Sequence, residues 1–276
     1  MTYYLVGSKG RLGQAIFKAV SHDEVVCLDR SIYEGWPNSS STTRISKYFE
    51  SVKETNPTIL VASGLLDPNA CSEDLTSVNY TLPKNIIDGS TKLGFRVITF
   101  GTVMEGLVTS NNNYVQSKMR LNEYIQSLTY KNNSVVHIQL HTLYGLGEPS
   151  PFMFLGQILS ALKNNSSFEM TSGRQLREYH HFLDEAEAIR QIVDSQTTGV
   201  INLSNGKPVS LKEIAQQVFS VFCKSHLLRI GALPEPAEEN YDKNIFLESD
   251  FLRDITLRDS LSGIVEYMKA CYSSKA

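Results

Sequence analysis

The sequence predicts an α/β protein, with a doubly wound parallel sheet followed by a smaller C-terminal lobe. Three observations indicate this fold class. Short apolar runs alternate with amphipathic stretches through the first half of the chain, which is the pattern of a parallel sheet covered by helices. A glycine-rich turn follows the first apolar run directly. The length of 276 residues, 41% of them hydrophobic, suffices for one large domain or for a domain with a smaller lobe.

The N-terminal half carries the predicted sheet. A polar stretch at 31–43 is expected to be a loop, and Pro83 marks a start or a kink inside a long helix. We expect six strands with helices between them, which fits a doubly wound sheet. Five of these strands are 3–6, 24–28, 58–63, 96–100 and 135–140, and the helices are 11–21, 45–55, 72–93 and 115–130.

The alternation becomes less regular after about Tyr144. This half is expected to form a smaller substrate-binding lobe, with helices at 152–163, 211–222 and 259–270 and a strand at 200–203. The predicted domains are therefore 1–145 and 146–276, and the chain is free to cross between the two lobes.

Bulk properties exclude several classes of protein. The net charge of −3 gives no basic face for nucleic acid, and the apolar runs are too short to span a membrane. The N-terminus lacks the features of a secretory signal. Four cysteines are scattered without metal-like or redox spacing, namely Cys27, Cys71, Cys223 and Cys271. We expect free thiols, no metal site and a cytoplasmic location.

The glycine-rich turn predicts a dinucleotide-binding site. It reads Gly7-Ser8-Lys9-Gly10-Arg11-Leu12-Gly13, between a predicted strand and a predicted helix. Glycine permits a tight turn and close approach of the backbone to a pyrophosphate, and a helix N-terminus offers N–H donors and partial positive charge. The spacing G-x-x-G-x-x-G is one residue longer than G-x-G-x-x-G. The alternative interpretation is an ordinary glycine-rich turn.

An acid at the end of the second strand predicts a further cofactor contact. Asp29 lies 16 residues after Gly13, where an acid usually binds ribose hydroxyls and favours NAD(H). Arg30 follows it and Lys9 lies in the turn, and both could meet a 2′-phosphate, which favours NADP(H). The alternative is that both cations are solvated surface charges. We predict NADP(H) in preference to NAD(H).

Small residues close the third predicted strand. Ala62, Ser63 and Gly64 stand at its end, where they would let a cofactor lie along the strand ends. Asn79 lies in the following predicted helix, where a cofactor contact and an ordinary helix-face amide are equally compatible with the sequence.

A tyrosine and a lysine supply the predicted chemistry. Tyr114 and Lys118 are four residues apart, so they share a face of a helix. A positive charge favours the phenolate, so we expect Lys118 to lower the pKa of Tyr114 and make it a proton donor and acceptor. Thr102 ends the strand from Arg96, where its hydroxyl could bind a substrate carbonyl, although Thr is also common at strand ends.

The ordered set of these residues resembles an extended short-chain dehydrogenase/reductase, of the NAD-dependent epimerase/dehydratase family. A segment of the second half, Arg177 to Asp184, is similar to the R-[DE]-[YF]-x-H-x-x-D segment of its nucleotide-sugar members. Leu143-Tyr144-Gly145 is similar to their V-Y-G segment. The resemblance covers nearly the whole chain and implies a Rossmann-type fold.

The resemblance implies a role for each residue. Tyr114 would be the general acid, Lys118 would hold the nicotinamide ribose, and Thr102 would polarise the substrate carbonyl. Tyr144 and Arg177 would contact a nucleotide-diphospho-sugar, Arg177 through its guanidinium fork. His181 and Asp184 are expected to orient their loop.

Two departures from the family bear on the reaction. Val103 and Met104 follow Thr102, where sugar 4,6-dehydratases carry an Asp-Glu pair for the elimination, so dehydration is not expected. Only 11 residues separate Thr102 from Tyr114, fewer than in many 4-epimerases. The short segment, the segment from Thr171 to Arg177 and the chain length are similar to small C4-ketoreductases such as the CDP-paratose and CDP-abequose synthases. Reductases that make GDP-linked 6-deoxy sugars are an alternative within this class.

The expected function is NAD(P)H-dependent reduction of the 4-keto group of a nucleoside-diphosphate-linked deoxysugar, in deoxysugar, O-antigen or capsule biosynthesis. One alternative is an NAD-dependent nucleotide-sugar epimerase. An alternative from another class is a non-catalytic NAD(P)-binding regulatory subunit. The family also implies a homodimer formed through the helix that carries Tyr114.

Overall fold

The structure is a computed structural model, which describes residues 2–38, 40–52, 57–67, 69–106, 112–128, 134–195, 197–235 and 245–274. Residues 107–111 of the short segment between Thr102 and Tyr114 lie outside this part. Among the described residues, no helix combines the length and the apolar character that crossing a membrane requires.

The chain divides into two compact units. Unit 1 comprises residues 1–140 and 186–203, and unit 2 comprises 141–185 and 204–276. The sequence predicted a boundary at 145 with a chain free to cross between the lobes. In the structure the chain leaves unit 1 after Leu140, returns at Ala186 and leaves it again after Leu203.

Unit 1 contains a parallel sheet that, in the described part of the chain, has six strands in the order β10-β5-β4-β3-β1-β2. The doubly wound sheet predicted from the sequence is therefore confirmed. The strands are β1 Thr2–Val6, β2 Glu24–Leu28, β3 Thr58–Val61, β4 Arg96–Thr102, β5 Val135–Leu140 and β10 Gly199–Asn202.

The sixth strand corrects the sequence prediction. The strand expected at 200–203 was assigned to the smaller lobe, but β10 pairs with β5 in register Gly199 with Val136. Local apolar character predicts a strand but not its neighbour, because strand pairing is set by distant parts of the chain.

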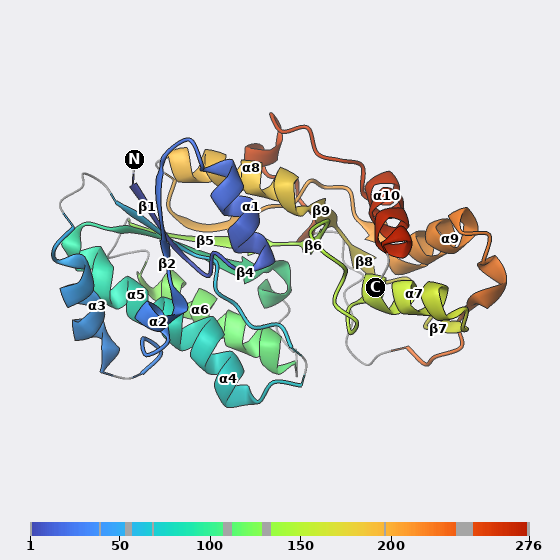
Figure 1. Ribbon diagram of the computed structural model, residues 1–276, viewed down its shortest axis with the longest axis horizontal. Coiled ribbons are helices and arrows are strands. Elements are labelled where there is room, and N and C mark those ends of the chain that lie inside the picture. Colours follow the sequence, from blue (N-terminus) through green and yellow to red (C-terminus); the bar gives the residue numbers. More distant parts are fainter. Residues whose placement is uncertain are drawn as a thin grey trace. The chain divides into compact units, whose positions relative to one another are not determined.

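Helices cover both faces of this sheet (Figure 1). One face carries the apolar sides of α3, α5 and α6, whose residues Phe49, Ile86 and Leu121 pack in one core with β1, β3 and β4. The other carries α1 and the later part of α8. The unit 1 helices are α1 Arg11–Ala19, α2 Arg30–Tyr33, α3 Ser41–Phe49, α4 Ser72–Thr76, α5 Leu82–Ser90 and α6 Asn113–Leu128, and α8 Phe182–Asp194 begins in unit 2 and continues into unit 1.

Two local predictions need correction. The expected loop at 31–43 holds most of α2, which begins at Arg30 with Asp29 as its N-cap. The long helix expected over 72–93 is α4, a π-helical turn at Ser77–Thr81 called η1, α5 and a short 3₁₀ turn at Thr91–Leu93. Pro83 lies at the start of α5, as predicted.

Unit 2 is built around its own apolar core, in which Leu159, Phe219 and Met268 are buried. These residues come from three helices that pack together, α7 Phe154–Asn164, α9 Leu211–Val221 and α10 Ser260–Ser273. Short strand pairs complete the described part of the unit: β6 Thr142–Tyr144 with β9 Tyr179–His181, β7 Phe168–Met170 with β12 Leu228–Ile230, and β8 Leu176–Arg177 with β11 Val209–Ser210.

Candidate active site

The glycine-rich turn is tightly packed at the carboxyl ends of β1 and β3. Gly7 has φ +85, a conformation that L side chains rarely adopt, and a Cβ there would lie 2.5 Å from the backbone nitrogen of Ser63. Gly13 in α1 packs against Gly7. Gly10 is the N-cap residue of α1 and has no side chain to cover the helix N-terminus. Arg11 and Leu12 lie in the first turn of α1.

This turn lies where the strand order reverses. The chain runs from β1 to β2 on one side and then to β3 on the other side of β1. In open parallel sheets ligands bind outside the carboxyl ends of the strands at such a point. Gly7 approaches the backbone of Ala62 and Ser63 so closely that no side chain fits at position 7. A glycine turn before a helix N-terminus is the kind of site that can accept a pyrophosphate.

Two predicted cofactor residues pair with each other. Lys9 Nζ lies 3.2 Å from Asp29 Oδ2, and both side chains are exposed. Asp29 also accepts hydrogen bonds from the amide and hydroxyl of Ser31. The Ser31 amide and then Lys9 hold the pKa of Asp29 below its usual value. Arg30 is exposed in the first turn of α2, so the carboxylate and both cations gather at the end of β2.

Asn79 links the loop after β3 to α6. Its side chain is fully buried, and its amide pairs with both the N–H and the carbonyl of Leu65 at 2.9 Å. The same amide donates to Ser117 Oγ at 3.1 Å. A Cβ on Gly64 would lie 3.7 Å from Asn79 Oδ1 and 3.8 Å from Lys118 Nζ. Asn79 therefore fixes Gly64 beside Lys118.

Tyr114 and Lys118 occupy the first turns of α6. Asn112 starts the helix, because its side chain accepts from the amide of Tyr114 at 2.9 Å. Lys118 is buried and its ammonium donates to the carbonyl of Phe100 at 2.7 Å. This bond joins the helix that carries Tyr114 to the strand that ends at Thr102.

The net pKa shift of Tyr114 is opposite to the lowering that its spacing from Lys118 predicts. Burial, followed by the negative charge of Glu105, raises the pKa of Tyr114 above its usual value. Burial also lowers the pKa of Lys118 to about 8, against the opposing charge of Glu105. Both pKa shifts are set by desolvation and by Glu105, which is not part of the i, i+4 pair of Tyr114 and Lys118.

Thr102 stands at the end of β4 with Glu105 beneath it. The Thr102 amide donates to Glu105 Oε1 at 2.8 Å, and Thr102 Oγ1 accepts from the amide of Met104 at 3.3 Å. Glu105 lies in a 3₁₀ turn, Val103–Gly106, and is 5% exposed. Glu105 is a residue of the candidate site that the sequence motifs do not indicate. The available signal was an acid three residues after Thr102, in a run without other charges.

Two of the three predicted substrate residues, Tyr144 and Arg177, lie in unit 2, whereas Thr102 lies in unit 1. Arg177 is half-buried in β8, where its guanidinium donates to the carbonyl of Leu176 at 2.8 Å. Tyr144 is 2% exposed, and its hydroxyl faces Gly263 of α10 without a hydrogen-bond partner in the described part of the chain. Tyr144 thus packs in the core of unit 2.

The remaining residues of the Arg177 segment hold structure together. His181 Nδ1 accepts from the amide of Leu183 at the start of α8. Asp184 binds the guanidinium of Arg258. These contacts fit the orienting roles expected for His181 and Asp184.

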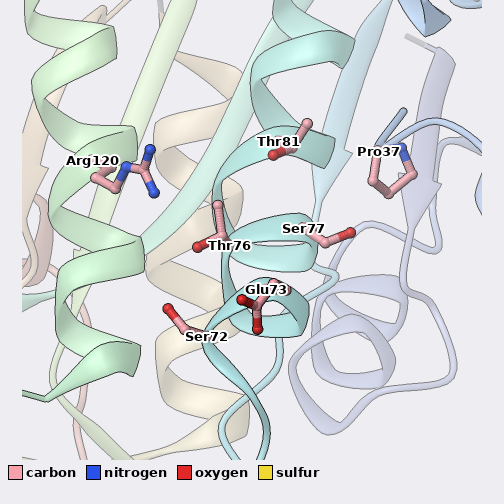
Figure 2. A pocket seen from close by; sticks show the side chains of 7 residues that line it. All are labelled: Pro37, Ser72, Glu73, Thr76, Ser77, Thr81 and Arg120. Atoms are coloured by element: carbon pink, nitrogen blue, oxygen red, sulfur yellow. The ribbon is translucent and has the colours of Figure 1, made fainter. Parts of the chain in front are cut away.

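A separate hollow of about 410 Å³ opens beside α4 and η1 (Figure 2). Arg120 of α6 faces it and stacks over the ring of Tyr80, 5.0 Å from its centroid. The lining is mostly hydroxyl-bearing and comprises Pro37, Ser72, Glu73, Thr76, Ser77, Thr81 and Arg120. None of the residues predicted for cofactor or substrate belongs to this lining.

Comparison with known proteins identifies a family and a fold. Residues 3–204 match the model of the NAD dependent epimerase/dehydratase family. No curated protein matches the sequence.

Solved structures match over nearly the full length. A dTDP-4-dehydrorhamnose reductase from Clostridium acetobutylicum is 18% identical, with 98% of this chain and 99% of that chain covered and a TM-score of 0.74. A dTDP-4-dehydrorhamnose reductase from Bacillus anthracis in complex with NADP is 14% identical, with 98% of each chain covered and a TM-score of 0.72. A UDP-N-acetylglucosamine 4-epimerase from Methanobrevibacter ruminantium is 16% identical, with 98% and 96% covered and a TM-score of 0.73.

Proposed function

Because the chain belongs to the NAD dependent epimerase/dehydratase family, we propose that it reduces the 4-keto group of a deoxysugar linked to a nucleoside diphosphate, with NADPH or NADH as reductant. The observation that carries this proposal is the 2.7 Å bond from Lys118 to the carbonyl of Phe100. It holds Tyr114 and Lys118 against the strand end that presents Thr102. Matched structures that are named as nucleotide-sugar reductases support the substrate class.

In the proposed ketone reduction, the residues of the candidate site have different roles. The glycine turn and the end of β2 would hold the cofactor, which supplies the hydride when bound. Thr102 Oγ1 would donate a hydrogen bond to the carbonyl oxygen of the substrate. Tyr114 would then give its phenolic proton to that oxygen as it becomes an alkoxide. The raised pKa of Tyr114 keeps the phenol protonated at neutral pH, as a proton donor requires.

The position of Glu105 argues against dehydration. An elimination needs an acid or base that reaches the sugar. Glu105 is buried and its carboxylate is bound by the Thr102 amide and by Gln139. It is therefore occupied within the protein, and Val103 and Met104 supply no acid in its place.

The test is Tyr114→Phe, with Tyr48→Phe as a matched control on the surface of α3. Purified protein is mixed with NADPH and CDP-, GDP- or dTDP-linked 4-keto sugars, and NADPH consumption is followed. The wild type and the control should consume NADPH in step with the alcohol formed. Tyr114→Phe should lose at least about a hundredfold in turnover while it still binds NADPH. Equal turnover in both variants would refute the assignment.

The same measurements separate the alternatives. An epimerase would carry bound NAD and interconvert sugars without added reductant. A regulatory subunit would bind cofactor, turn over no ketosugar and copurify with another enzyme.

A further inference from the structure

Glu105 is the centre of a buried polar cluster beneath the end of β4. Its Oε1 accepts from the amide of Thr102 at 2.8 Å. Its Oε2 accepts from Gln139 Nε2 at 3.2 Å and lies 3.0 Å from His137 Nε2. His137 has no exposed surface. A carboxylate so deeply placed needs partners for both oxygens, and Glu105 has them.

Both ring nitrogens of His137 have hydrogen-bonding neighbours. Thr99 Oγ1 lies 2.8 Å from His137 Nδ1 and 3.3 Å from the carbonyl of Val136. The Thr99 hydroxyl donates to the Val136 carbonyl. Because a carboxylate oxygen accepts, His137 Nε2 is the donor in its contact with Glu105. Three donors therefore meet the carboxylate, from Thr102, Gln139 and His137.

The chain makes room for this carboxylate at Gly101. A Cβ on Gly101 would lie 2.8 Å from Cδ of Glu105 and would also collide with His137. On either side of Gly101 the strand end is held by opposite charges. Glu105 binds the amide of Thr102, and Lys118 binds the carbonyl of Phe100.

We propose that Glu105 is a positioning residue for the proposed reductase site, because its buried carboxylate fixes the Thr102 backbone and acts as the counter-charge of Lys118 at the same strand end. This inference rests on the proposed function only for its effect on turnover. The fixed backbone and the paired charges are properties of the protein alone.

The groups around Lys118 support the electrostatic part of the inference. The Lys118 ammonium binds the Phe100 carbonyl of β4 and lies close to Gly64 in the loop after β3. Tyr114 lies one turn away from Lys118 on α6. Among the described residues, the charge of Glu105 is the one that acts on both Tyr114 and Lys118, and it raises both pKa values. Removing that charge should lower both.

The charge is tested with Glu105→Gln, which keeps an oxygen for the Thr102 amide. Lys118 is titrated by carbon-13 NMR of labelled lysine in cofactor-free protein, and its signal is assigned by its loss in Lys118→Arg. We expect the pKa of Lys118 to fall by about one pH unit or more. Glu123→Gln removes an exposed carboxylate from α6 and should leave that pKa unchanged. If the pKa of Lys118 is the same in Glu105→Gln and in Glu123→Gln, the proposal that Glu105 is the counter-charge of Lys118 is wrong.

The positioning is tested with Glu105→Asp, which keeps the charge on a shorter side chain. The Thr102 amide should exchange with solvent deuterium at least about tenfold faster than in the wild type, because the carboxylate no longer reaches it. Lys118 should titrate near its wild-type pH. Unchanged exchange at Thr102 would contradict the positioning role, and this variant decides the question if Glu105→Gln does not fold.

Turnover separates this inference from the proposed function. In Glu105→Gln, the pH at which kcat/KM has fallen to half on the alkaline side should move to a lower value. In Glu105→Asp, kcat should fall by a larger factor than KM changes. If the wild type reduces no ketosugar, the proposed function fails, while the titration and exchange measurements still decide the role of Glu105.

Discussion

Gly13 in α1 packs directly against the carbonyl group of Gly7, so closely that a methyl group at position 13 would lie 2.9 Å from the carbonyl carbon. The contact joins the first strand to the first helix. The proposed cofactor site at this turn would therefore depend on the absence of a side chain at position 13.

Gly13→Ala should destabilise the protein and weaken cofactor binding together. The added methyl group must displace backbone, and overpacking of this kind costs about 1–3 kcal/mol. Chemical denaturation measures the stability, and NADPH fluorescence measures the binding. Gly106→Ala is the control, because a Cβ there would meet nothing within 4 Å. A Gly13→Ala protein as stable as this control would contradict the packing argument.

Lys9→Ala should reduce the preference for NADPH over NADH. The Lys9 ammonium lies at the end of β2, 3.2 Å from Asp29, where a 2′-phosphate would be an additional anionic partner. Loss of one charged hydrogen bond would weaken NADPH binding on the order of tenfold and leave NADH binding nearly unchanged. Calorimetric titration with each cofactor provides the measurement. Lys18→Ala is the control, because Lys18 lies in the last turn of α1, and it should weaken the binding of neither cofactor. If Lys9→Ala weakens NADPH and NADH binding equally, Lys9 does not contribute to the cofactor preference.

His180 should make the protein less stable as pH rises above neutrality. Burial alone lowers the pKa of His180, but the carboxylates of Glu185 and Glu178 outweigh burial and raise it to about 10. A raised folded-state pKa adds stability that is complete below the unfolded pKa of about 6.5. That stability is lost as pH rises through about 10. Urea unfolding at pH 7, 8.5 and 10 should show the decline.

The matched variants for this prediction are His180→Gln and His226→Gln. His180 lies 2.7 Å from Glu185 and 3.2 Å from Glu178. Its replacement leaves two buried acids without their cation, at a cost of about 3–5 kcal/mol at pH 7. His226 is exposed in a 3₁₀ turn, and its replacement should keep wild-type stability. A pH dependence in His180→Gln as steep as that of the wild type would assign the decline to another group.

Much of the fold follows from local pattern. The strands that begin at Thr2, Thr58 and Val135 were predictable because each is a mainly apolar run of strand length. The glycine turn was predictable because its spacing lies between a strand and a helix. The place of β10 beside β5 was not, because pairing joins segments about 60 residues apart in the chain.

The electrostatics of the candidate site could not be derived in the same way. The spacing of Tyr114 and Lys118 predicted a lowered tyrosine pKa, and the structure gives a raised one. The cause is burial together with Glu105, which the 3₁₀ turn after β4 brings beneath the strand. A linear pattern contains neither the depth of a side chain nor its partners from other strands.

The return of the chain through Ala186–Leu203 decides how the protein can be divided. A fragment cut at 145 would lack β10 and would leave one side of β5 with unpaired amides and carbonyls, although Val135, Val136 and Ile138 of that strand are buried in the intact protein. An edge strand with unpaired backbone groups tends to pair with strands of other chains. Unit 1 is therefore not a detachable module, and domain swaps with other proteins would have to carry two separate stretches of sequence.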